Sequence, residues 1–142
     1  MNPTIEKFGY PATLLREFDY WVLLLRPAQV TLGSLVLAAR SDATAYHELP
    51  REAFTEQGDA VQAIERVLAS FTQYERINYL MLMMVDPNVH FHVFPRYSKA
   101  RQWRGIEFPD PGWPGPPQLG SAVALEPDQL RELTTEIALN FR

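Results

Sequence analysis

The chain of 142 residues contains no cysteine. Disulfide bridges, zinc sites built on thiolates and cysteine nucleophiles are therefore excluded. This is compatible with a reducing compartment, and we expect a cytoplasmic protein. No apolar run is long enough to span a bilayer. The first residues lack the basic region followed by an apolar stretch that marks a signal peptide, so we expect neither a membrane anchor nor secretion.

Basic residues are outnumbered by acidic ones, which gives a formal net charge of −4. A general nucleic-acid surface needs an excess of Lys and Arg, so we expect no nucleic-acid partner. A small anionic ligand needs only a local cluster of hydrogen-bond donors and stays compatible with this charge. Apolar residues make up 46% of the chain and charged residues 21%, which is typical of a folded globular protein. The length predicts one domain over residues 1–142.

Short apolar segments and helical patterns predict an α+β fold, with an antiparallel sheet, one main helix and a C-terminal helix packed against it. Apolar residues at helical spacing place the main helix at residues 52–72, and a second stripe behind Pro127 places the other at 127–141. The core should span residues 14–104. The expected strands are 14–18, 20–25, 34–39, 77–85 and 89–94, where the first two could also be one strand with a bend near Asp19.

The segments between these elements carry further expectations. Residues 1–12 predict an irregular lead-in, and Asp86-Pro87 predicts a tight turn that pairs the last two strands as a hairpin. Residues 96–104 are rich in basic side chains, which predicts either a solvated loop or contacts with extra phosphates. The stretch 109–117 is too rich in Pro and Gly for regular structure, and Trp113 should pack this loop down. Met81, Met83 and Met84 should fill the core.

Two of the three histidines, His90 and His92, lie two positions apart in the strand predicted at 89–94. Successive side chains of a strand point to opposite faces, so these two share a face with Asn88 and Phe94. The two histidines stand about 6.6 Å apart along the strand. Two imidazoles at this spacing can flank one phosphate, where one ring attacks phosphorus and the other donates a hydrogen bond or a proton.

Three interpretations of this pair stay open on the residues alone. The pair could be the polar, solvent-facing side of a half-buried strand. It could bind zinc or iron, which needs a third ligand such as His47 or Asp86, although no ligand spacing supports that site. His47, just before a helix, is more typical of a surface or capping residue. The third interpretation is nucleophilic chemistry at phosphorus.

The wider sequence 78–97 resembles the signature of the histidine triad (HIT) superfamily. That signature alternates His with apolar residues three times and closes with two apolar residues, Pro and Arg. The Trp113-Pro114-Gly115-Pro116 stretch is similar to one in bacterial members described as diadenosine tetraphosphate hydrolase-like. The resemblance covers most of residues 14–117. It implies a homodimer that binds a nucleotide and needs no cofactor.

Counting back from Pro95-Arg96, His92 fills the third position of the signature, His90 the second and Asn88 the first. The resemblance then implies that His90 is the nucleophile and that His92 contacts the phosphate and the leaving group. Asn can donate and accept hydrogen bonds, but it cannot titrate near neutrality. The substitution at Asn88 should therefore slow turnover or change its pH dependence without abolishing phosphate binding.

The resemblance also implies which other residues contact the nucleotide. Arg26 stands where relatives often carry Asp or Asn for the ribose, and a cation cannot accept the ribose hydroxyl hydrogen bonds. The implied reaction is hydrolysis at the α-phosphate of a dinucleoside polyphosphate or a nucleoside phosphoramidate, through a nucleotidyl-histidine. The alternatives are a nucleotide-binding protein with little or no turnover and a metal-dependent enzyme. Besides the two histidines, the expected contacts are Asn88, Leu24, Arg26, Ser34, Val36 and Arg96.

Overall fold

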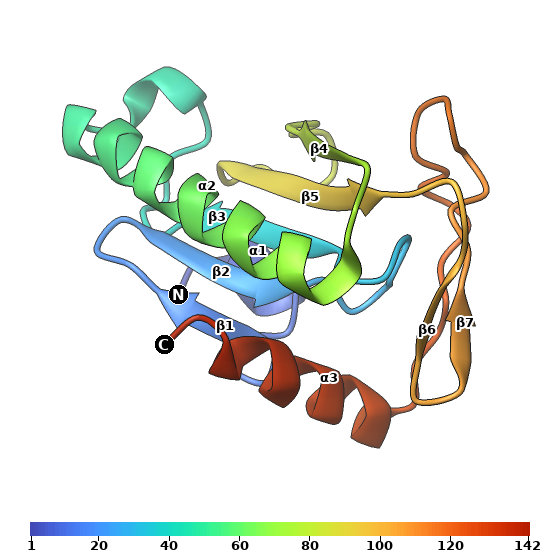
Figure 1. Ribbon diagram of the computed structural model, residues 1–142. Helices are drawn as coiled ribbons and strands as arrows, with labels where there is room; N and C mark the ends of the chain where they lie inside the picture. The colour runs from blue at the N-terminus through green and yellow to red at the C-terminus, as the bar shows by residue number, and fades with distance from the viewer.

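The computed structural model describes residues 1–142 and is built around a five-stranded sheet. All neighbouring strands are antiparallel, in the order β1-β2-β3-β5-β4 (Figure 1). The strands are β1 (Leu14–Glu17), β2 (Trp21–Leu25), β3 (Leu35–Ala39), β4 (Arg76–Leu80) and β5 (His90–Arg96). The predicted α+β fold is confirmed.

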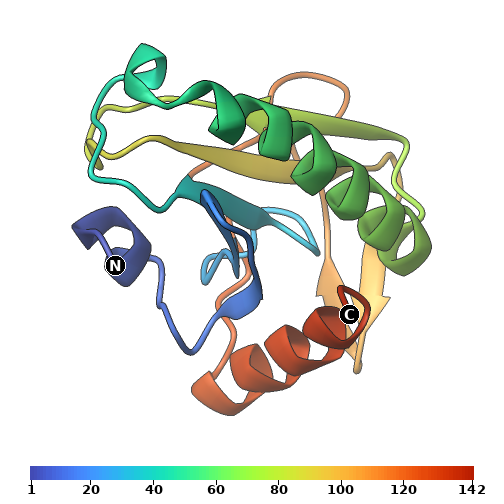
Figure 2. The same cartoon turned by 90° about the vertical axis from the view of Figure 1, so that its left-hand side faces the viewer.

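Three α-helices surround the sheet, and α2 (Arg51–Thr72) and α1 (Pro3–Lys7) lie on opposite sides of it (Figure 2). The third, α3 (Pro127–Leu139), packs beside β1. A short 3₁₀ helix, η1 (Tyr46–Glu48), precedes α2. The main and C-terminal helices thus form close to the ranges predicted from their apolar stripes.

The central strands are apolar along their whole length because both faces of the sheet are covered. In β2, Trp21, Leu23 and Leu25 belong to the large core under α2. Val22 and Leu24 belong to a second, smaller core on the opposite face. This smaller core is completed by side chains of the N-terminal segment, Ile5 and Phe8.

The N-terminal segment is not an irregular lead-in, and that prediction is wrong. Pro3 occupies the first turn of α1, where its missing N–H does no harm. The side chain of Asn2 caps the helix by accepting a hydrogen bond from the Ile5 N–H at 2.9 Å. Its Nδ2 donates to the carbonyls of Ala39 and Ser41, which anchors α1 to the end of β3.

The segment between β4 and β5 also differs from the prediction. The two strands pair antiparallel as expected, but β4 ends at Leu80 and residues 81–89 form a long loop instead of a tight turn. Met83 has a left-handed backbone with φ 54°, which interrupts the extended conformation. Met81 and Met83 pack against the core in part, whereas Met84 is 85% exposed, so the prediction that Met84 fills the core is wrong.

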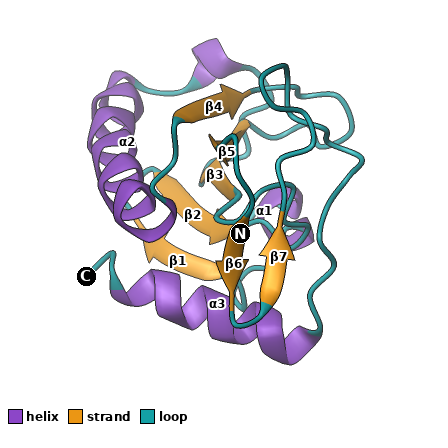
Figure 3. Cartoon of the chain, turned by 45° about the vertical axis from the view of Figure 1, so that its right-hand side comes forward, coloured by secondary structure: helices purple, strands orange, loops and turns teal.

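A small hairpin that the sequence did not predict follows β5 (Figure 3). It consists of β6 (Arg101–Trp103) and β7 (Ile106–Phe108). Its two-residue turn, Arg104-Gly105, has positive φ at both positions, as hairpins of this length require. No helix of the chain is long and apolar enough to cross a membrane.

Candidate active site

A pocket of about 280 Å³ lies on the side of the sheet that α1 covers. It is open to solvent between the end of α1, the start of β5 and the loop 81–89. Both histidines of the signature line it, and so does Arg26, which follows β2. The lining residues are Lys7, Phe8, Arg26, Leu82, Met83, Met84, Val85, Asp86, His90 and His92.

His90 is held in one tautomer by the backbone. Its Nδ1 lies 2.7 Å from the carbonyl oxygen of Asn88. A carbonyl oxygen can only accept a hydrogen bond, so Nδ1 carries a hydrogen, and in the neutral ring the lone pair is then on Nε2. A neutral imidazole with a free Nε2 is the form in which histidine acts as a nucleophile.

His92 has the opposite arrangement. The Nε hydrogen of Arg26 points to His92 Nδ1 across 3.3 Å, so Nδ1 accepts and the ring hydrogen sits on Nε2. Burial, and then the charges of Arg26 and His90, lower the pKa of His92 to about 4, against the opposing effect of Asp86. His92 is thus neutral near pH 7 and offers an N–H donor beside His90.

Phe8 covers the two histidines from the end of α1. Its ring centroid lies 5.7 Å from that of His90 and 5.6 Å from that of His92. The two imidazoles meet edge to face with centroids 5.0 Å apart. Only 2% of His90 and 8% of His92 is exposed. The pair is therefore shielded from bulk water, which strengthens any electrostatic interaction made there.

The rim of the pocket carries two cations and one carboxylate. Lys7 Nζ forms an ion pair with Asp86 Oδ1 at 2.7 Å, which joins the end of α1 to the loop before β5. Arg26 donates one N–H to His92 and another to the carbonyl of Ala28. A guanidinium has five N–H donors, so Arg26 retains donors for a bound anion.

Asn88, which stands in the first position of the signature, binds other parts of the protein. Its Oδ1 accepts a hydrogen bond from Thr4 Oγ1 at 2.9 Å, and its Nδ2 donates to the carbonyl of Asp42 at 3.2 Å. Asn88 does not line the pocket. It contributes to the site through its backbone carbonyl, which orients His90.

Leu24 and Val36 lie in the small core next to the histidines. The two residues pair across β2 and β3, and Val36 also pairs with His92. Both are fully buried and pack in the same cluster as Ile5 and Phe8. They form the apolar floor of this face and do not line the pocket.

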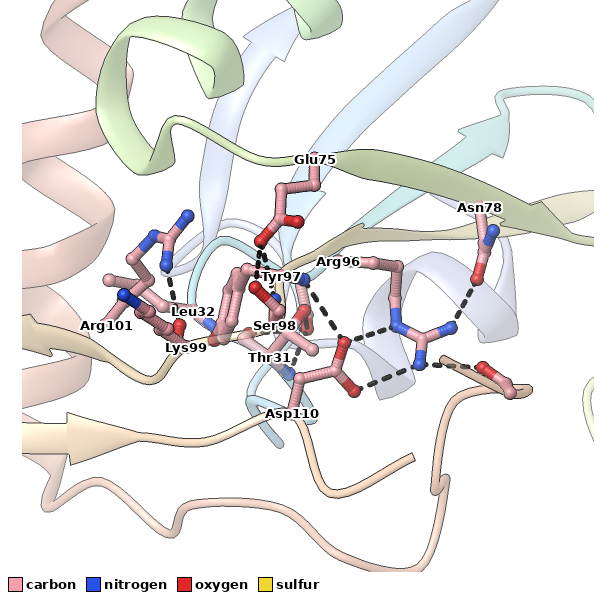
Figure 4. A network of polar contacts seen from close by, with 12 residues as sticks. Thr31, Leu32, Glu75, Asn78, Arg96, Tyr97, Ser98, Lys99, Arg101 and Asp110 are labelled. Atoms are coloured by element: carbon pink, nitrogen blue, oxygen red, sulfur yellow. Dashed lines mark hydrogen bonds and ion pairs between the residues drawn. The ribbon is translucent and has the colours of Figure 1, made fainter. Parts of the chain in front are cut away.

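Two further predicted contacts lie outside the pocket. Ser34 is buried in the turn before β3, where its hydroxyl donates to the carbonyl of Thr31. Arg96 lies at the far end of β5, where it forms a buried ion pair with Asp110 (Figure 4). Its guanidinium also donates to Asn78 Oδ1 and the carbonyl of Gly115. Arg96 thus fixes the 109–117 loop to the sheet.

The basic stretch after Arg96 is directed away from the histidines. Arg101 donates to the backbone carbonyls of Thr72 and Gln73 at the end of α2. Arg104 forms ion pairs with Glu132 and Glu136 of α3. These side chains connect the hairpin to two helices, and the structure gives them no contact with the pocket.

Sequence reasoning missed the pocket walls, which are Phe8, Lys7 and the loop 82–86. The signal for α1 was present, because Asn followed by Pro is typical of a helix start. No comparable signal marked the loop, since its apolar side chains continue the pattern of β4.

The metal alternative lacks its third ligand. His47 lies exposed in η1. No three His, Cys, Asp or Glu side chains converge anywhere in the structure so that they could hold a metal ion. The two histidines instead form a pair with complementary donor and acceptor nitrogens.

Solved structures of histidine triad proteins resemble this chain over nearly its whole length. One from Marinobacter aquaeolei has a TM-score of 0.75 with 20% identity, over 96% of this chain and 93% of that protein. One from Sinorhizobium meliloti has a TM-score of 0.74 with 22% identity, over 99% and 95%. The diadenosine triphosphate hydrolase of Plasmodium falciparum has a TM-score of 0.68 with 10% identity, over 96% and 92%.

No family model and no curated protein sequence matches the chain. The likeness to the solved structures establishes the fold: the chain has the histidine triad fold, as the motif at residues 78–97 implied.

Proposed function

We propose that this protein binds nucleotides and hydrolyses a nucleotide conjugate at its α-phosphate, with His90 as the nucleophile. The observation that carries the proposal is the bond from His90 Nδ1 to the carbonyl of Asn88, which in the neutral ring puts the lone pair on Nε2, beside the N–H donor of His92. The fold shared with a diadenosine triphosphate hydrolase is consistent with this chemistry.

The reaction would have two steps. His90 Nε2 attacks the α-phosphorus, the bond to the leaving group breaks with its electron pair, and a nucleotidyl-histidine forms. The Nε2–H of His92 donates a hydrogen bond to the departing oxygen or nitrogen. Water then attacks the same phosphorus, the bond between phosphorus and His90 Nε2 breaks, and one proton of the water passes to solvent. This releases the mononucleotide and regenerates His90. Arg26 and Lys7 would neutralise charge on the phosphate oxygens.

Variants of the histidines test this proposal. We expect His90→Ala to abolish hydrolysis of diadenosine polyphosphates and adenosine phosphoramidate, and His92→Ala to slow it by about 10²- to 10⁴-fold. His47→Ala is the matched control, because His47 is exposed and outside the pocket, and it should keep full activity. Unchanged activity in the His90 variant would contradict the assignment of His90 as the nucleophile.

The second candidate function is nucleotide binding with little or no turnover. It is favoured by Asn88 at the first signature position and by the cation Arg26 near the expected ribose. Mass spectrometry of rapidly quenched reactions separates the two functions. A protein that gains the mass of one nucleotidyl group supports catalysis. A protein that is stabilised by AMP in a thermal shift assay, yet never carries the adduct, is a binding protein.

We also propose a homodimer, which the resemblance implies. Sedimentation equilibrium of the purified protein tests this, because its monomer mass is 16.3 kDa. A mass that stays at this value over the accessible concentration range would contradict it.

A further inference from the structure

A second, larger cavity of about 500 Å³ lies at the other end of β4 and β5. The sheet forms its floor and the 109–117 loop its wall. Figure 4 shows Asn78 and Arg96, which line it, and Asp110, which Arg96 binds. The cavity is lined by Arg76, Asn78, Arg96, Trp113, Pro114, Gly115 and Pro116.

The two cavities share one face of the sheet. In the register of β4 and β5, Arg76 pairs with Arg96, and Leu80 pairs with His92. Side chains two or four positions apart on a strand point to the same face. Arg96 therefore lies on the side of the sheet that carries the histidines, about 13 Å from His92 along β5.

One cation, Arg26, lies between the two cavities. The Phe94 ring stacks on His92 with centroids 6.0 Å apart. The guanidinium of Arg26 lies over that ring, 5.7 Å from its centroid. Arg26 thus stands between the histidines and the second cavity.

The second cavity presents hydrogen-bond donors that the protein does not use. Arg76 donates only to the carbonyl of its neighbour Glu75, and the amide nitrogen of Asn78 has no partner. The indole N–H of Trp113 is also free, whereas those of Trp21 and Trp103 bind an oxygen. Of the nearby carboxylates, Asp110 is already bound by Arg96, and Glu75, which precedes Arg76, is bound by Ser98. The cavity therefore suits an anion.

We propose that this cavity is a second subsite, which binds the distal phosphates of a polyphosphate leaving group while the α-phosphate lies at His90. This inference rests on the proposed function and narrows its substrate class to nucleotides with an extended polyphosphate chain. In such a substrate the chain would run from the histidines past Arg26 to Arg76 and Asn78.

The protonation state of His92 also favours substrates that have a polyphosphate leaving group. A neutral imidazole donates a hydrogen bond but is a weak acid. A polyphosphate leaves without a proton near pH 7, whereas an amine leaving group must be protonated as it departs. The site is thus better matched to cleavage of a phosphoanhydride than of a phosphoramidate.

Inorganic tripolyphosphate tests the subsite without catalysis. In an NMR titration of protein labelled at its tryptophan indoles, we expect the Trp113 signal to shift and those of Trp21 and Trp103 to stay. Arg76→Gln should weaken this binding by about 10-fold or more. Arg66→Gln is the matched control, because Arg66 is exposed on α2 and makes no ion pair.

Steady-state kinetics provide a second test of the subsite. Arg76→Gln should lower kcat/KM for diadenosine tetraphosphate relative to adenosine phosphoramidate by about 10-fold, and Arg66→Gln should leave that ratio as it is. The proposed subsite is contradicted if the Trp113 signal does not shift when tripolyphosphate is added, or if it shifts with protein concentration alone. If Trp113 responds but His90→Ala still hydrolyses nucleotides, the subsite stands and the proposed nucleophile fails.

Discussion

The Nε hydrogen of Arg26 points at Nδ1 of His92 across 3.3 Å. The contact places a permanent cation against a buried imidazole. It has two effects on His92: it fixes the hydrogen on Nε2, and it opposes a second proton on the ring. Both effects keep His92 as a neutral donor beside His90.

Replacing Arg26 should raise the pKa of His92. Burial is the largest cause of the lowered pKa and Arg26 the next, so in Arg26→Gln we expect a pKa above 4 that still falls short of the ordinary 6.5. An NMR titration of the imidazole signals measures this. Arg66→Gln serves as the control, and an equal pKa in the two variants would show that Arg26 does not act on His92.

The same lowered pKa makes stability depend on pH. Unfolded, His92 binds a proton below about pH 6.5, but in the folded protein it does so only near pH 4. The unfolded state thus binds more protons between these values, and stability falls as the pH is lowered through this window. The contribution is at most about 3 kcal/mol. Urea unfolding at several pH values should show a shallower dependence for His92→Asn than for the wild type. If the free energy of unfolding changed equally with pH in the two proteins, His92 would not be the source of this pH dependence.

Asn88 should matter more for stability than for catalysis. Asn88→Ala loses the hydrogen bonds with Thr4 and Asp42 but keeps the backbone carbonyl that orients His90. We expect a loss of about 1–3 kcal/mol in the free energy of unfolding, with the nucleotidyl-histidine still formed.

The control for this variant is Asn140→Ala, which removes an exposed side chain at the end of α3. A double variant with Thr4→Val should lose less than the sum of the single losses, because the two side chains share one bond. Strict additivity would mean that the Thr4 contact contributes nothing.

The strands and long helices could be predicted because their apolar patterns match the surfaces they cover. The spacing of Ala60, Ile64 and Val67 predicts a helix that packs one face on the sheet, and all three are buried where α2 covers it. The same logic failed after Leu80. The apolar run continues there, but Met84 and Val85 are exposed beside the pocket, and no local pattern separates a pocket wall from a buried strand.

The candidate site could be predicted only along β5 and at Arg26. Strand alternation placed His90 and His92 on one face, and the structure brings Arg26 to them. The contribution of Phe8 depends on where α1 packs, and that is set by contacts such as Thr4 with Asn88, far apart in the sequence. Arg96 was predicted to contact phosphate as the first residue of the basic stretch 96–104, but its partner Asp110 lies in a loop whose path the sequence does not reveal.

Breaking the Arg96–Asp110 pair should destabilise the protein strongly. Only 4% of the Arg96 side chain and 0% of the Asp110 side chain is exposed. Arg96→Met would leave a buried carboxylate without its cation, which costs about 3–5 kcal/mol. The matched control is Arg131→Met, which breaks the exposed pair of Arg131 with Asp128 and should change stability by about 1 kcal/mol or less. Similar melting temperatures for the two variants would contradict this.

Gly33 should not tolerate a side chain. Its φ is +90°, and a Cβ there would lie 3.1 Å from Leu68 Cδ2 and 3.2 Å from Thr72 Cγ2. Both neighbours belong to the end of α2, which packs over the turn before β3, so Gly33→Ala would combine backbone strain with crowding. We expect a loss of about 1–3 kcal/mol in the free energy of unfolding, measured by urea unfolding.

Gly58→Ala is the opposite case. Gly58 lies in α2, and a Cβ there would meet nothing within 4 Å, so this variant should stabilise the protein by about 1 kcal/mol. If Gly33→Ala were as stable as Gly58→Ala, the close approach of α2 to this turn would be in error.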